Sequence, residues 1–360
     1  MDQSPGTASW NTAENPKNAF WATEYVFAKY EWMSLDFRIA HALKVIQVIY
    51  YPGLAIIALP VNLVTILILS RGKCGLSRVV TRYLVAMAAA DLMVVVLDLI
   101  LSKIPNIYTP IELLIWAADT PVCQIHTVLL YAATDCSVWF TVTFTFDRFV
   151  AICFQKLKTT YCTGRTAAVM LGTVTAISCL RNIYWYFRLS GYYAALIAPF
   201  ICVDTADYVS LFVAMSIDLF HYLLTPVIPF LLVLLTNALT FRYVLVTSRG
   251  RRRLRRADKG QSARDPEMES RRKSLVLLLI ISGNFVLLWA PFTVYSAWNR
   301  LSAFSAVTLP ADSLRGLGSM LQILSCCTNT AFYAVTQTKF REQLKEAINH
   351  PLAVIAARMS

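Results

Sequence analysis

The sequence predicts an all-α membrane protein, built as a bundle of seven transmembrane helices. Hydrophobic residues make up 57% of its 360 residues and charged residues only 15%, and the mean hydropathy is +0.54. Soluble domains carry roughly 25% charged residues, and a soluble chain this apolar would expose large apolar patches. Much of the formal net charge of +12 lies in residues 248–274. A charge confined to one segment is typical of a loop between membrane spans, and we expect no nucleic-acid partner.

Seven segments are apolar enough to supply the spans. A bilayer core about 30 Å thick needs about 20 apolar residues of helix. The expected spans lie near residues 45–70, 83–103, 122–146, 166–187, 217–246, 274–298 and 313–337. The last is the weakest, because Ser, Thr, Gln and Asn interrupt it. Hydropathy by itself therefore leaves six or seven spans open, and we expect seven.

Loop charges set the orientation of the bundle, because lysine and arginine concentrate on the cytoplasmic side of a membrane. With the N-terminus outside, the cytoplasmic segments are residues 71–78, 154–165, 248–274 and the tail after residue 337. These segments hold most of the 33 Lys and Arg residues. We therefore predict an extracellular segment at 1–44, a seven-transmembrane domain at 45–337 and a cytoplasmic region at 338–360.

The cytoplasmic region begins with an amphipathic pattern. Phe340, Leu344, Ala347 and Ile348 recur at helical spacing, while the basic residues between them fall on other faces. Such a helix lies along the inner leaflet of the bilayer. A frayed polar tail is the alternative, but it leaves the periodicity unexplained.

Polar residues and prolines inside the spans are the candidates for function, because ionisable groups in a membrane are expensive. They are Asn62, Asp91, Pro226, Pro229, Trp289, Pro291, Asn329 and Tyr333. Each alone is explained by hydrogen bonding across a helix interface or by a proline kink. Their occurrence together, one set per helix and in this order, weakens that explanation.

This ordered set resembles the rhodopsin-like (class A) G-protein-coupled receptors. The motifs are an asparagine in the first span, AMAAAD in the second, Asp-Arg-aromatic after the third, FxxxWxP in the sixth and NxxxY in the seventh. Longer stretches, such as SRGKCGLSRVVTRYLVAMAAAD, resemble the orphan "probable G-protein-coupled receptor 139" group. The resemblance covers roughly residues 45–350. It implies a multi-pass plasma-membrane receptor, not an enzyme, that activates a heterotrimeric G protein when an extracellular small ligand or short peptide binds.

The resemblance assigns roles to single residues. Arg148 is expected at the cytoplasmic mouth, held by Asp147 at rest and released to meet the G protein. The residues expected to complete this coupling and activation switch are Asn237, Asn329 and Tyr333. The transmission switch between ligand and G protein is expected at Phe285, Trp289, Pro291 and Pro229. The family pattern also pairs Cys123 with Cys202 in a disulfide.

A second expectation from the family is an allosteric sodium ion. The positions that enclose it are Asp91, Ser137, Ser325 and Asn329. Oxygen ligands around a carboxylate suit a hard cation. The competing interpretation is that Asp91 protonates or binds water instead. No other cofactor or metal is expected.

The ligand pocket follows by correspondence with the family. Its expected members are Leu130, Tyr131, Thr134, His221, Thr225, Phe292, Thr293, Ser296 and Ser319. They describe an apolar cavity with a few polar points, the usual small-ligand arrangement, in which His221 is the only titratable member. We expect His221 to be a satisfied bundle histidine, with a ligand contact as the alternative. Asp135, one turn below the pocket mouth, is expected to bond a neighbouring helix.

Two substitutions narrow the ligand class. Leu130 stands where amine receptors carry an aspartate, which argues against a biogenic amine, and Ile323 stands where opsins carry the Schiff-base lysine, which excludes retinal. The group resemblance suggests an aromatic amino acid or a short peptide.

Departures from the family pattern bear on regulation. Arg271 stands where some members carry an acidic partner for the span-three arginine, so we expect a weak resting lock and raised basal activity. Asn237 replaces a common tyrosine, which puts the usual water-bridged contact to Tyr333 in doubt. Arrestin capture would have to use the third cytoplasmic loop. Its candidate phosphorylation sites are Ser262, Ser270 and Ser274.

The rival function is a small ion- or proton-coupled membrane transporter with Asp91, Asp135 and Asp147 as relay groups. Carriers often show internal repeats and paired broken helices, and no repeat is evident in this sequence. An enzyme is a third option, but the sequence has no recognisable metal-ligand cluster, nucleophile elbow or phosphate-binding loop.

Overall fold

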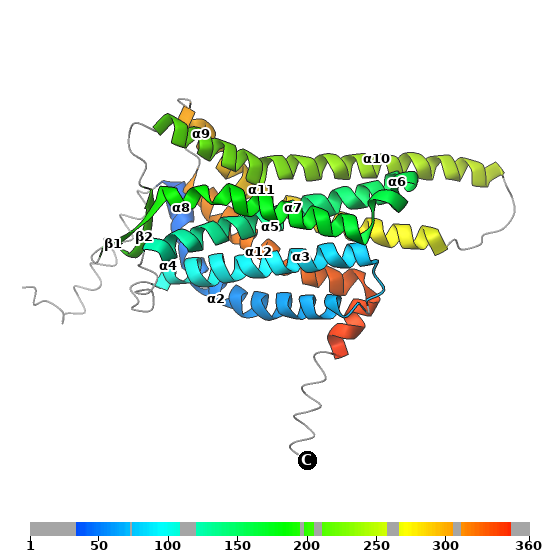
Figure 1. Cartoon of the computed structure of the whole chain (residues 1–360), viewed down its shortest axis with the longest axis horizontal. Coiled ribbons are helices and arrows are strands. Elements are labelled where there is room, and N and C mark those ends of the chain that lie inside the picture. The colour runs from blue at the N-terminus through cyan, green and yellow to red at the C-terminus, as the bar shows by residue number, and fades with distance from the viewer. Residues whose placement is uncertain are drawn as a thin grey trace, which may run out of the picture.

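The computed structural model describes most of the chain as a long helical bundle (Figure 1). The described residues are 34–72, 74–108, 120–194, 198–204, 211–257, 266–304 and 311–346. Long helices run side by side along one axis, and the two strands lie together at one end. By the predicted orientation, the end with the strands is extracellular.

The spans appear in the predicted order, several of them as joined helical pieces. They are α2 (Leu35–Ser70), α3 (Arg78–Val94) with the π-helix η1 (Val95–Lys103) and α4 (Ile104–Tyr108), α5 (Thr120–Cys153), α7 (Gly164–Asn182) with α8 (Tyr184–Arg188), α9 (Leu211–Tyr222) with the π-helix η4 (Leu223–Val227) and α10 (Ile228–Ala257), α11 (Pro266–Phe304), and α12 (Asp312–Thr336). A short helix, α6 (Gln155–Tyr161), lies between the third and fourth spans.

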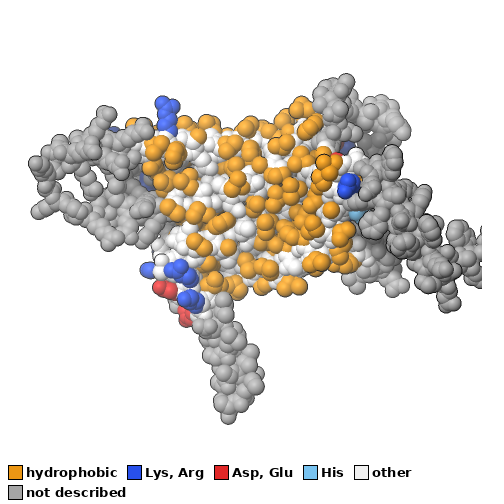
Figure 2. Space-filling model, turned by 180° about the vertical axis from the view of Figure 1, so that it is seen from behind, with side chains coloured by type: hydrophobic (Ala, Val, Ile, Leu, Met, Phe, Trp, Pro, Cys, Tyr) orange, Lys and Arg blue, Asp and Glu red, His pale blue; other side chains and the backbone are white. Residues whose placement is uncertain are grey.

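The long helices have the length and the apolar composition needed to cross a membrane. Among the described residues, six helices are long and apolar enough to span a bilayer. α12 is the seventh, a 25-residue helix that is more polar, as its sequence predicts. Apolar side chains cover the flank of the bundle in Figure 2, and lysine and arginine side chains gather near its two ends. This distribution matches an apolar belt facing lipid.

Several helices extend beyond the predicted spans, because a helix need not end where the apolar bilayer core ends. α2 begins at Leu35, ten residues before the predicted start at 45. Ser34 provides the N-cap, since its side chain accepts the backbone N–H of Phe37 at 3.3 Å, and a serine in this position stabilises a helix start.

α5 is the central helix of the bundle. In its apolar stretch 72% of the residues are buried, against 17% in the α7–α8 stretch, and α5 contacts α3, α7, α10 and α11. The core between α5 and its neighbours contains Tyr83, Phe144 and Tyr333, each almost fully buried. Side chains on α5 can therefore meet partners from most of the other spans.

The fifth span is broken where its sequence places two prolines. Thr225 has a non-helical backbone (φ −152°, ψ 109°) inside η4, directly before Pro226, which has no N–H to donate. Pro229 follows as the second residue of α10, and Pro291 lies inside α11. The break at Thr225 therefore separates α9, at the outer end, from the long inner helix α10.

A β-hairpin covers the extracellular end, and the all-α prediction did not include it. β1 (Leu189–Ala194) pairs antiparallel with β2 (Ala198–Asp204), with Gly191 opposite Cys202. α5 contacts both strands. The hairpin that carries Cys202 therefore lies against the third span.

Residues 338–346 form the expected cytoplasmic helix. Its Phe340 side chain is fully buried and lies 5.9 Å, centroid to centroid, from the Tyr333 ring. Leu344 packs against the same core, while Ala347 and Ile348 lie outside the described residues. Through Phe340 and Leu344, the apolar face of this helix therefore packs on the bundle and not only on lipid.

Candidate functional site

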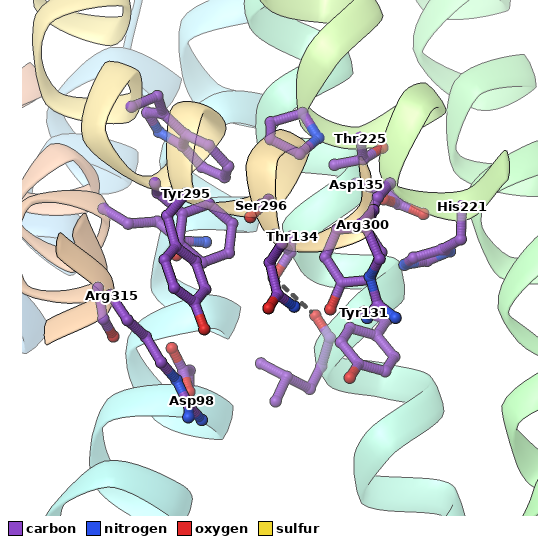
Figure 3. Close-up of a pocket in the computed structure, with 18 of the residues that line it drawn as sticks. Asp98, Tyr131, Thr134, Asp135, His221, Thr225, Tyr295, Ser296, Arg300 and Arg315 are labelled. Atoms are coloured by element: carbon purple, nitrogen blue, oxygen red, sulfur yellow. Dashed lines mark hydrogen bonds between the residues drawn. The ribbon is translucent and has the colours of Figure 1, made fainter. Parts of the chain in front are cut away.

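A cavity of about 460 Å³ opens within the extracellular half of the bundle (Figure 3). Side chains from the second, third, fifth, sixth and seventh spans line it. Eight of the nine predicted pocket residues do so: Leu130, Tyr131, Thr134, His221, Thr225, Phe292, Ser296 and Ser319. Thr293 is not among the lining residues. It is buried, and its hydroxyl donates to the backbone oxygen of Trp289 at 2.8 Å.

The cavity is far more polar than the sequence predicted. Five aspartate, lysine and arginine residues also line it, namely Asp98, Lys103, Asp135, Arg300 and Arg315. Figure 3 shows Asp98 and Arg315 on one side of the cavity and Asp135 with Arg300 on the other. The expectation of an apolar cavity with His221 as its only titratable member is therefore wrong. The signal was present in the sequence, since Asp98 falls within the expected span 83–103 and a charge inside a span marks a functional candidate.

His221 is held by aromatic rings. It is buried, with 9% of its surface exposed, and its ring centroid lies 5.4 Å from Tyr131, 5.4 Å from Trp185 and 5.7 Å from Tyr222 in edge-on arrangements. Such tilted ring contacts are the preferred geometry of aromatic pairs. His221 is thus a packed bundle residue that also lines the cavity.

The buried carboxylate of Asp218, near the cavity mouth, pairs with two arginines. Arg188 donates to both oxygens of Asp218, from Nη1 at 2.5 Å and from Nη2 at 3.3 Å. Arg300 reaches the same carboxylate from the sixth span at 3.5 Å and lies 4.2 Å over the Tyr222 ring. The Nε of Arg300 is buried with no hydrogen-bond partner in the structure. The Arg300 guanidinium therefore keeps one donor available at this corner of the cavity.

Asp135 bonds a neighbouring helix, as expected. It forms an ion pair with Arg181 of α7 and accepts a hydrogen bond from Asn182 Nδ2 at 2.5 Å. The prediction that Asp135 bonds a neighbouring helix is confirmed. Sequence reasoning missed Arg181, although a charged residue inside the expected span 166–187 is itself a signal.

Asp91 lies at the centre of the bundle, fully enclosed by three helices. Its Oδ1 accepts from Ser137 Oγ of α5 at 2.5 Å, and its Oδ2 accepts from Asn329 Nδ2 of α12 at 2.9 Å. Three of the four residues predicted to enclose sodium therefore meet at one carboxylate. Ser325 is engaged elsewhere, accepting from Trp289 Nε1 at 2.9 Å and donating to Gln322 O at 2.7 Å.

The predicted transmission residues lie between the cavity and Asp91. Phe285 and Trp289 are buried together, with ring centroids 5.4 Å apart. Trp289 also lines the cavity, while its indole N–H reaches Ser325. Pro229 is buried at the start of α10, below the break. One side chain, Trp289, thus connects the floor of the cavity to the seventh span.

The Asp147–Arg148 pair lies buried at the cytoplasmic end of α5. Arg148 donates from Nε to Asp147 Oδ2 at 3.0 Å and also through Nη2. The Cys162 thiol donates to the backbone oxygen of Asp147 at 3.6 Å. Burial raises the pKa of the Cys162 thiol to about 11, so it remains protonated and able to donate at neutral pH. The geometry is the paired arrangement that the family pattern associates with rest.

The other switch residues are separated from one another. Asn237 accepts from Ser282 Oγ of α11 at 3.0 Å, and Tyr333 is buried against Phe340. The Tyr333 hydroxyl has no hydrogen-bond partner in the structure. Asn237 and Tyr333 therefore do not meet in this arrangement. The side chains of Glu269, Ser270, Arg271 and Ser274 lie outside the described residues, as does the whole of Ser262.

Asn62 acts as a connector between helices. Its Nδ2 donates to Ala58 O of its own helix at 3.1 Å and to Cys326 O of α12 at 3.0 Å. One turn further along, Thr65 bonds Thr330 at 2.6 Å. These contacts join the first and seventh spans beside the Asp91 centre.

Cys123 is disulfide-bonded, and the described cysteines at 74, 136, 153, 162, 179, 326 and 327 are free thiols. The predicted partner, Cys202, lies on β2, where side chains are outside the described residues. The pairing with Cys202 stays a prediction, compatible with the contact between α5 and β2.

Comparison with known proteins places the chain among seven-helix receptors. A family model described as "7 transmembrane receptor (rhodopsin family)" matches residues 61–333. The chain is also 24% identical over 307 residues to "Probable G-protein coupled receptor 142" of Mus musculus, a match that covers 84% of this chain and 73% of the mouse protein. The family model spans the cavity, the Asp91 centre and the Asp147–Arg148 pair.

Proposed function

This chain belongs to the rhodopsin family of seven-transmembrane receptors, and we propose that its extracellular cavity binds a small zwitterionic ligand or a short peptide. It is a multi-pass G-protein-coupled receptor of the plasma membrane. The transporter alternative has no support in the family match.

The charges of the cavity carry the ligand proposal. Asp98 and Arg315 line one side and Arg300 lines the other. The Nε of Arg300 is buried without a hydrogen-bond partner in the structure. A ligand with both an ammonium and a carboxylate group could satisfy both signs at once, whereas a singly charged ligand would leave one desolvated charge unmatched. The aromatic residues beside Arg300, including Tyr222, favour an aromatic or apolar side group. An aromatic amino acid or a short peptide end has this combination.

A route for the signal follows from the order of the functional residues along the bundle, from the extracellular cavity to the cytoplasmic end. A ligand in the cavity touches Trp289, which is bonded to Ser325 of α12, and the Asp91 centre lies beneath. The cytoplasmic ion pair lies further along α5. A ligand that binds one arrangement of these helices better than the other shifts the population toward it. The G protein, by binding the arrangement with Arg148 released, biases the same equilibrium.

Sodium remains part of the proposal. In the structure Ser137 Oγ and Asn329 Nδ2 donate to the Asp91 carboxylate. With the Asn329 amide turned so that its Oδ1 faces the carboxylate, the three residues would offer oxygen atoms, a donor set that suits a hard cation. When bound there, sodium would supply a positive charge that neutralises the buried carboxylate. Ser325 would have to leave Trp289 to join this set. Arrestin recruitment through Ser262, Ser270 and Ser274 also remains a proposal.

The ligand proposal is tested with matched compounds. Cells expressing the receptor and G-protein biosensors are exposed to an aromatic amino acid, to its decarboxylated amine and to its deaminated acid. The intact amino acid is expected to activate, and each analogue to be weaker by at least about tenfold, since each leaves a buried charge unmatched. Arg300→Gln should weaken the amino acid and leave the amine unchanged. Equal potency of the amine and the amino acid on the unaltered receptor would contradict a zwitterionic ligand.

A further inference from the structure

Arg181 joins three helices at a polar junction beside the cavity. It forms an ion pair with Asp135 of α5, and its Nη2 donates to Thr225 Oγ1 of η4 at 3.0 Å. Its neighbour Asn182 donates to Asp135 at 2.5 Å and to Ser178 O at 2.8 Å. The fourth span thereby holds side chains of the third and fifth spans. None of the roles described above uses this junction.

The junction is largely buried, yet some of its polar atoms have no hydrogen-bond partner in the structure. The Asp135 side chain is 2% exposed and the Arg181 side chain 18%. The Nε of Arg181 and the Oδ1 of Asn182 are buried without hydrogen-bond partners in the structure. A buried ion pair contributes little net stability, and a partly satisfied network is less favourable than an apolar one. Stability therefore does not explain why these residues lie here.

The position of Thr225 indicates what the junction does. Thr225 is the residue at which the fifth span leaves helical geometry, between α9 and α10. It lines the cavity together with Asp135, and Figure 3 shows the two side by side on one wall. The guanidinium of Arg181 therefore connects an acidic residue of the cavity wall to the residue where the fifth span bends.

We infer that Arg181 is a positioning residue that couples the acidic wall of the cavity to the break in the fifth span. By bonding Thr225 while paired with Asp135, it holds α10 in the arrangement in which Asp147 and Arg148 are also paired. A ligand that draws Asp135 or Thr225 toward itself weakens this hold and releases α10. The inference rests on the receptor function and adds a residue through which the cavity acts on the cytoplasmic end.

The test compares two substitutions at Thr225. Thr225→Val keeps the β-branched shape and removes the hydroxyl that Arg181 bonds, whereas Thr225→Ser keeps the hydroxyl. Ligand-free signalling is measured with biosensors for the four classes of G-protein α-subunit and divided by the amount of receptor at the cell surface. Thr225→Val should raise this ratio by about fivefold, which corresponds to about 1 kcal/mol, and Thr225→Ser should raise it clearly less than Thr225→Val does.

The assignment to Arg181 is tested by combination. In an Arg181→Met background, Thr225→Val should have no further effect, because the donor is already gone, whereas Arg181→Lys should retain part of the hold. If Thr225→Val fails to reach the surface, Asp135→Asn replaces it, with the same expected rise and the same loss of effect in the Arg181→Met background.

Two results would overturn the inference. One is that Thr225→Val or Asp135→Asn gives the same ligand-free signalling per surface receptor as the unaltered receptor, whether that signalling is high or low. The other is an equal rise with and without Arg181. Failure of the receptor function gives a different result: adding Arg148→Ala to Thr225→Val would then leave the raised signal unchanged.

Discussion

Gly318 of α12 lies directly against the backbone of Phe292 in α11. A Cβ at Gly318 would come within 2.8 Å of the Phe292 nitrogen and 2.9 Å of its Cα. This contact falls one residue after Pro291, which lies inside α11. The two helices that carry Trp289 and Ser325 are therefore as close as a residue without a side chain allows.

Gly318→Ala is expected to destabilise the receptor by about 1–3 kcal/mol, because the backbone of α11 must move away. The measurement is the melting temperature of the purified receptor. Gly283→Ala is the matched control, since a Cβ at Gly283 meets nothing within 4 Å. That variant should be neutral or more stable, because alanine favours a helix over glycine by about 1 kcal/mol. Equal losses at both positions would refute the close-contact explanation.

Asp36 caps the start of the seventh span from the first. Its carboxylate oxygens accept the backbone N–H groups of Asp312 and Ser313, each at 3.1 Å, and Ala311, the N-cap residue of α12, makes no side-chain cap. Asp36→Ala should therefore cost about 1 kcal/mol of stability, seen as a lower melting temperature. Asp36→Asn retains an acceptor oxygen and should lose less. The cap would be unimportant if alanine and asparagine gave the same melting temperature as aspartate.

From the Asp147–Arg148 pair we predict that the receptor signals measurably without ligand. In the described residues Arg148 is paired with Asp147 of its own helix, and the sixth span offers Arg271 where an acidic partner could stand. With this local partner, and with arginine instead of an acidic residue at position 271, the released state should be populated without ligand. Ligand-free signalling should therefore be measurable and should disappear in Arg148→Ala at unchanged surface expression. Asp147→Asn should raise it. A signal that survives Arg148→Ala would show that this pair has another role.

Sodium removal tests the Asp91 centre. Replacing sodium chloride by equimolar N-methylglucamine chloride should raise ligand-free signalling, because the ion would stabilise the resting arrangement of Asp91, Ser137 and Asn329. Asp91→Asn should abolish the difference between the two salts. Thr65→Val is the control, since the Thr65–Thr330 bond joins the first and seventh spans without touching Asp91. A salt response that persists in Asp91→Asn would place the ion elsewhere or exclude it.

The sequence predicted the bundle well because its signals are local. A run of apolar residues needs no tertiary information, and the motif residues occur in a fixed order along the helices. Asp91, Ser137 and Asn329 meet, although they lie in three different helices. Correspondence with a family supplied that contact, and spacing by itself could not have done so.

The polar content of the cavity escaped prediction for a physical reason. Asp98 and Arg181 are single charges within long apolar spans, and hydropathy averages over them. Whether such a charge faces lipid, a partner helix or a cavity depends on the rotation of the helix in the bundle. The inward position of Phe340 and the β-hairpin are also products of tertiary packing.

The burial of Phe340 decides where the chain can be altered for experiments. Its ring packs against Tyr333 and closes the cytoplasmic side of the core. A truncation directly after the last span would remove the Phe340 ring and expose the Tyr333 ring to water. Fluorescent reporters and affinity tags should therefore be joined beyond residue 346.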